Sequence, residues 1–85
     1  MTVKAILMYE IVDASGDSVL LTREQALGLT DLVAGESGRL EGLQFVRWRD
    51  GDGAAVRRTV GIAPGPAVHV SEEDLAALKA LLETT

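Results

Sequence analysis

The chain has 85 residues, a formal net charge of −5 at pH 7 and no cysteine. A chain of this length forms one domain, residues 1–85, and buries only about 60 to 65% of the surface that its unfolded form exposes, which leaves little room for an enclosed active site. The lack of cysteine excludes disulfides, thiolate metal sites and a thiol nucleophile.

The composition gives two further expectations. Hydrophobic residues make up 47% of the chain with only one Phe, one Tyr and one Trp, so the core must be aliphatic. The N-terminal apolar run, residues 5–8, is too short for a signal peptide or a membrane span, and we expect a soluble cytoplasmic protein without a membrane partner. Six arginines against two lysines, with no Asn, indicate a GC-rich coding genome and a prokaryotic or phage origin.

The first predicted strand covers Val3 to Val12, because apolar and β-branched residues recur on both of its faces. We therefore expect it to be central in a sheet. A turn over residues 13–17 follows, and Ser18 to Leu21 returns as a short strand.

A helix is predicted from about Arg23 to Ala34. Thr22 is an N-cap with Gln25 at the capping-box spacing. Gly35 and Gly38 are interpreted as its stop signals. Its expected buried stripe is Ala26, Leu29, Leu32 and Val33.

A β-hairpin is the strongest local prediction. The segments Leu43 to Arg49 and Ala54 to Ile62 flank two Asp-Gly pairs at residues 50–53, which favour a tight turn. Residues 63–66 contain two prolines and are expected to be an extended connector.

The chain is predicted to close with a strand over Val68 to Val70 and a helix capped by Ser71. Acidic residues 72–74 suit the positive end of the helix dipole. The apolar stripe of this helix is expected to be Leu75, Leu78, Leu81 and Leu82.

The two strand-to-helix segments, residues 19–33 and 68–82, align without a gap. This match predicts either an internal ββα pseudo-repeat or convergence of two segments on one common local pattern. The fold class predicted from all elements is α+β, with a four- to five-stranded, mostly antiparallel sheet and both helices on one face.

Candidate sites for chemistry are few. His69 lies near Ser71 and Asp74, but its strand position favours a surface location, and Ser71 is better interpreted as a helix cap. The sequence at residues 50–53 resembles the start of a calcium loop, yet position 61 is Gly61 where the loop needs Glu. The glycines do not form a phosphate-binding pattern. We therefore expect no catalytic residues, no metal site and no cofactor.

The hairpin region is the candidate binding surface. Residues 39–60 contain five arginines against three carboxylates, a net charge of +2, whereas the rest of the chain has −7. Successive strand residues point to opposite faces, so these arginines cannot all form one patch. The alternative interpretation is that they shield an edge strand. The predicted partner-binding residues are Arg47, Trp48, Arg49, Arg57 and Arg58.

One sheet face is expected to remain poorly covered, including Trp48 and the second face of the first strand. The function expected from these features is a small non-catalytic protein-interaction module. It would act as a homodimer or as an accessory or inhibitory subunit, in one version a phage-type inhibitor of a host system. The alternative is a nucleic-acid-binding regulator that uses the Arg and Trp hairpin.

Overall fold

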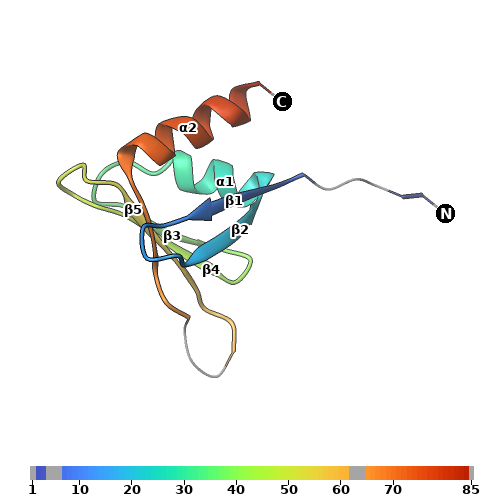
Figure 1. The fold of residues 1–85 in the computed structure, drawn as a ribbon, viewed down its shortest axis with the longest axis horizontal. Helices are drawn as coiled ribbons and strands as arrows, with labels where there is room; N and C mark the ends of the chain where they lie inside the picture. Colours follow the sequence, from blue (N-terminus) through green and yellow to red (C-terminus); the bar gives the residue numbers. More distant parts are fainter. Residues whose placement is uncertain (1, 4–6, 62–64, 85) are drawn as a thin grey trace.

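The computed structural model describes residues 2–3, 7–61 and 65–84. It confirms the α+β class, with two helices and six strands in two antiparallel sheets (Figure 1). One sheet is the pair β1-β2, and the other has the order β3-β4-β5-β6. The elements are β1 (Met8–Val12), β2 (Ser18–Thr22), α1 (Arg23–Thr30), β3 (Ser37–Leu40), β4 (Leu43–Arg47), β5 (Ala54–Arg58), β6 (Val68–Val70) and α2 (Glu72–Glu83).

The β1-β2 hairpin differs from the predicted first strand. Tyr9 and Ile11 are buried, whereas Met8 and Val12 on the other face are exposed. Within the described residues β1 pairs only with β2, so the expectation of a central strand is wrong. Apolar residues on both faces do not indicate a central strand here, because the outer face of the hairpin has no covering layer. Residues 4–6 of the predicted strand lie outside the described residues.

Helix α1 begins as predicted and ends earlier. Thr22 accepts a hydrogen bond from the Gln25 backbone N–H, and the Gln25 side chain accepts one from the Thr22 N–H, which completes the capping box. The helix ends at Thr30, not near Ala34, with Asp31 as C-cap. Polar Thr30 and Asp31 weaken the helical pattern at this point. Val33, expected in the buried stripe, is consequently 63% exposed.

Strand β3 (Ser37–Leu40) is not predicted by the sequence pattern, and Gly38 lies inside it instead of stopping a helix. Its turn to β4 consists of Glu41 and Gly42, with φ of 50° and 83°. Two residues at positive φ form the primed turn that suits a two-residue hairpin.

The predicted β4-β5 hairpin is confirmed, with shorter strands than expected. The Trp48 N–H donates to the Gly53 carbonyl oxygen at 2.9 Å, and Gly51 and Gly53 both have positive φ. The strands end at Arg47 and Arg58, not at Arg49 and Ile62, and Ile62 lies outside the described residues. The connector predicted at residues 63–66 is described only at residues 65 and 66.

Helix α2 follows β6 directly, with the predicted Ser71 cap accepting from the Asp74 N–H at 3.1 Å. Both helices lie on one side of the four-stranded sheet and contact each other (Figure 1). Leu81, expected in the buried stripe, is 54% exposed. The core is formed by Tyr9, Ile11, Val19, Leu21, Ala26, Leu29, Leu43, Phe45, Ala54, Val56, Val68, Val70, Leu75, Leu78 and Leu82.

Candidate functional site

The predicted partner-binding residues are distributed over different parts of the surface. Arg47 points to the helix side of the sheet, where Nη2 donates to both carboxylate oxygens of Glu72 at 2.9 and 3.0 Å. Arg49 lies beside Gly35 in the loop after α1, and Arg58 lies beside Gly65. Arg47 and Arg58 therefore do not form a common patch with Trp48 and Arg57, whereas Arg49 lines a surface hollow together with Trp48, Asp50 and Asp52.

The opposite face of the four-stranded sheet, here called the open sheet face, is not covered by either helix. Its cross-strand rows are set by the register, in which Arg39 is opposite Gln44 and Gln44 is opposite Arg57. Arg57 Nη2 donates to Gln44 Oε1 at 3.0 Å. By strand alternation, the open sheet face carries Arg39, Gln44, Val46, Ala55, Arg57 and His69, without a carboxylate from these strands.

Trp48 extends this face at one end. It lies two residues after Val46, and its N–H continues the β4-β5 ladder to Gly53. Trp48 is 39% exposed. Trp48 and Arg57 were predicted as binding residues from the sequence. Arg39 and His69 were not placed on the same face, because β3 was not predicted and β6 was not paired with β5.

His69 is exposed, as its strand position predicted, and lies on the opposite face of β6 from buried Val68 and Val70. Its backbone N–H donates to Asp13 Oδ2 at 3.4 Å, while the Ser71 hydroxyl is engaged as the α2 cap. Asp13 also accepts from the Ser15 hydroxyl at 2.7 Å. The hydrogen bond from the Ser15 side chain lowers the pKa of Asp13 below its usual value.

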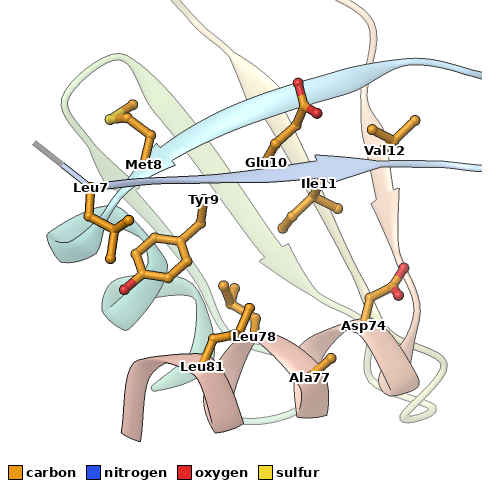
Figure 2. Close-up of a pocket in the computed structure, with 10 residues that line it drawn as sticks. All are labelled: Leu7, Met8, Tyr9, Glu10, Ile11, Val12, Asp74, Ala77, Leu78 and Leu81. Atoms are coloured by element: carbon orange, nitrogen blue, oxygen red, sulfur yellow. The ribbon is translucent and has the colours of Figure 1, made fainter. Parts of the chain in front are cut away.

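An apolar groove separates strand β1 from helix α2 (Figure 2). It has a volume of about 470 Å³ and is lined by residues 7–12 and by Asp74, Ala77, Leu78 and Leu81; we call it the β1–α2 groove. Leu7 and Leu81 are 57% and 54% exposed at its rim. Exposed apolar side chains at the rim of a concave surface give a partner apolar area to bury.

One wall of the groove is an unpaired sheet edge. The Asp13 N–H donates to the Asp17 carbonyl oxygen, so residues 13 and 17 are a hydrogen-bonded pair of the hairpin. Hydrogen-bonded pairs alternate along antiparallel strands, so Tyr9 and Ile11 bond to β2. The backbone groups of Met8, Glu10 and Val12 therefore point away from β2, along the free edge.

The charged residues that line the groove are both acidic. Glu10 projects from β1 on the side away from α2, and Asp74 projects from the first turn of α2 (Figure 2). Neither carboxylate has an ion-pair partner among the described residues, where the one salt bridge joins Arg47 and Glu72. The groove thus combines apolar walls, unpaired backbone groups and negative charge.

The sequence pattern did not indicate this groove. The second face of β1, predicted to be poorly covered, is exposed at Met8 and Val12 but points away from α2 (Figure 2), and Leu81 was assigned to the core. Leu81 is 54% exposed at the groove, and this exposure is set by tertiary packing, which local patterns do not encode.

Comparisons with protein-family models, curated proteins and solved structures give no match to this chain. Neither helix in the described ranges has the length and apolar character needed to cross a bilayer. Among residues 2–3, 7–61 and 65–84, no cluster of three or more His, Cys, Asp or Glu side chains is arranged to hold a metal ion.

Proposed function

We propose that this protein is a small non-catalytic interaction module that attaches to another protein through the β1–α2 groove and acts as its accessory or inhibitory subunit. The observation that carries the proposal is the position of the groove directly beside the free edge of β1. Apolar side chains supply the area for binding, and unpaired backbone groups supply directional hydrogen bonds.

The groove walls combine a buried and an exposed leucine of α2. Leu78 is buried and fixes one wall of the groove, while Leu81 stands exposed one helical turn further along α2. A partner side chain that packs over Leu81 would bury apolar surface, and each Å² buried contributes about 25 cal/mol of favourable binding free energy. Tyr9 and the aliphatic residues around it line the groove, so contacts with a partner there would be mainly apolar.

The experiment is capture of the tagged protein from a lysate of its source cell, with and without nuclease, using matched variants. Leu81→Glu places a charge in the groove, and Val33→Glu places the same charge at an exposed aliphatic position outside it. We expect one stoichiometric protein to bind the wild type and Val33→Glu and to be reduced by about tenfold or more with Leu81→Glu. Equal recovery with Leu81→Glu, or no recovered protein, would overturn the proposal.

A second candidate function is binding of nucleic acid on the open sheet face. The observation that favours it is the set Arg39, Arg57 and Trp48 on a face whose strands contribute no carboxylate. Arginine and an aromatic ring on a sheet surface suit stacking and phosphate contacts. The acidic remainder of the molecule opposes it.

The two candidate functions can be distinguished by the salt dependence of binding and by the variants that abolish it. Binding of a labelled single-stranded oligonucleotide that weakens steeply with salt, and is lost in Arg39→Ala with Arg57→Ala, would establish the second candidate. No binding at low salt would remove it. The Leu81→Glu variant should not affect such binding.

A further inference from the structure

The free edge of β1 has little of the protection that sheet edges commonly have. Edge strands are commonly blocked by charged side chains, especially Lys, by Pro, by a bulge or by a covering segment. Over Met8–Val12 the strand has no Pro and no Lys, and it pairs with β2 in an uninterrupted register. Glu10 is its single charge. In contrast, the free edge of β6 is met by Asp13, whose Oδ2 accepts from the His69 N–H.

We propose that the β1–α2 groove receives an extended strand of the partner protein, which pairs antiparallel with β1 and carries a basic residue opposite Glu10 between apolar residues. This inference rests on the proposed function and specifies its partner. The antiparallel direction gives the slightly more stable ladder. The added strand would extend a two-stranded sheet, which is a marginal structure without further packing.

The hydrogen-bonding pattern of the occupant follows from the edge. Met8, Glu10 and Val12 direct their N–H and C=O groups outward, so three alternate residues of the incoming strand pair with them. The two residues between these three direct their backbone groups away from β1. The binding free energy therefore depends on alternate amides of the occupant and not on all of them.

The side-chain pattern follows from the pleat, because directly opposite residues share a face of the sheet. Tyr9 and Ile11 point toward α2, whereas Met8, Glu10 and Val12 point away from it (Figure 2). The occupant residues opposite Tyr9 and Ile11 would then lie over Leu78, Leu81 and Ala77, and they should be apolar. The three occupant residues opposite Met8, Glu10 and Val12 point away from α2. The middle one, opposite Glu10, should be basic, and the two outer ones should be apolar.

Charge argues against a second copy of this chain as the occupant. The register that pairs all of Met8–Val12 with the same strand of a second copy sets Glu10 directly opposite its counterpart. Like charges directly opposite one another destabilise a strand pair. Each copy also has a net charge of −5, and Asp74 adds a further negative charge beside the groove. A basic, apolar strand satisfies the same edge without this repulsion.

The test uses the full chain and a capped fluorescent peptide with the core sequence valine-leucine-lysine-leucine-valine between glycine-serine flanks. Binding is measured by fluorescence anisotropy. We expect saturable binding of this peptide with a dissociation constant below about 1 mM. N-methylation of the central lysine, whose amide should face β1, should weaken binding by about tenfold or more. N-methylation of either leucine should change it by less than about twofold.

A charge exchange tests the assigned contact. Glu10→Lys should lose the lysine peptide and bind a peptide with glutamate at the central position, whereas Glu24→Lys on α1, an equal change in net charge, should behave as the wild type. No binding, equal effects of all N-methyl groups, or an ineffective exchange would overturn the strand-addition assignment. A dimer of the chain alone that the neutral substitution Glu10→Gln strengthens and that blocks the peptide would also overturn it, in favour of a second copy.

The two proposals fail in different ways. Cellular capture that depends on Leu81 but is not competed by the peptide would leave the groove as the binding site and refute the strand. Capture that is independent of Leu81 would refute the groove itself.

Discussion

Arg47 and Glu72 join the end of strand β4 to the first residue of helix α2, 25 positions apart in the chain. The guanidinium Nη2 donates to Glu72 Oε1 at 2.9 Å and to Oε2 at 3.0 Å. Glu72 Oε1 also accepts from the Gly53 N–H at 3.1 Å. One carboxylate therefore holds the end of β4, the start of β5 and the N-terminus of α2 together.

This pair should contribute modestly to the free energy of unfolding. The Arg47 and Glu72 side chains are 18% and 45% exposed, so solvent screens their attraction. We expect Arg47→Met and Glu72→Gln each to lower the free energy of unfolding by about 0.5 to 1.5 kcal/mol. A double-mutant cycle by urea denaturation should give a coupling of about 0.5 to 1 kcal/mol.

The control for this cycle is Glu73→Gln, which removes a neighbouring charge without touching Arg47. A coupling of zero between Arg47 and Glu72 would mean that the hydrogen bonds in the structure add nothing beyond the separate contributions of the two residues.

Gly53 should tolerate no side chain. Its φ is 106°, and a Cβ at this position would overlap the carbonyl oxygen of Val70 on β6. We expect Gly53→Ala to lower the free energy of unfolding by more than about 2 kcal/mol, since both strain and overlap act. Gly51→Ala is the matched control, because Gly51 also has positive φ but open space around it, and should cost about 1 kcal/mol. Equal losses in the two variants would refute the close contact with Val70.

Glu41 offers a stabilising substitution. It has φ of 50° in the two-residue turn before Gly42, a conformation that Asn adopts more readily than Glu. Glu41→Asn should raise the free energy of unfolding by about 0.5 to 1 kcal/mol, and thermal denaturation measures it. The backbone carbonyl of Glu41 still accepts from Gln25 Nε2, so this contact is retained. A lower melting temperature would show that the Glu41 side chain has a role that the hydrogen bonds do not reveal.

The parts of the fold that follow from the sequence are those specified by short-range signals. The Asp-Gly turn of β4-β5, the Thr22 and Ser71 caps and the three-residue strand β6 lie where the pattern predicts. Strand β3 was missed because Ser37 and Gly38 have little strand propensity, and its structure depends on pairing with β4. Glu41-Gly42 is a local turn signal that could have indicated it.

The candidate site depends more strongly on tertiary structure. Alternation along β4 and β5 correctly excluded one patch containing all the predicted arginines, yet only the structure places Arg47 against Glu72 and Arg39 in a row with Arg57. The β1–α2 groove arises between segments more than 60 residues apart, and neither one shows it alone. The two aligned strand-to-helix segments share their cap and their buried strand positions, while duplication of the segment remains a prediction.

Asp13 should make stability depend on pH in the acid range. Its carboxylate accepts from the Ser15 hydroxyl, from the Ser15 and Asp17 N–H groups and from the His69 N–H on β6. The Ser15 side-chain bond is the main cause of its lowered pKa.

Because the folded pKa lies below the unfolded one, ionised Asp13 stabilises the fold above the unfolded pKa, and the stabilisation is lost as pH falls through the folded pKa. Asp13→Asn should therefore lower the melting temperature at pH 7 and have a smaller effect at pH values below the folded pKa of Asp13. Asp52→Asn is the control, since no described residue donates to that carboxylate, and its effect should not follow this pH dependence. A melting-temperature difference for Asp13→Asn that stays constant from neutral to acid pH would contradict the role assigned to the ionised carboxylate, which is to hold the β1-β2 turn against β6.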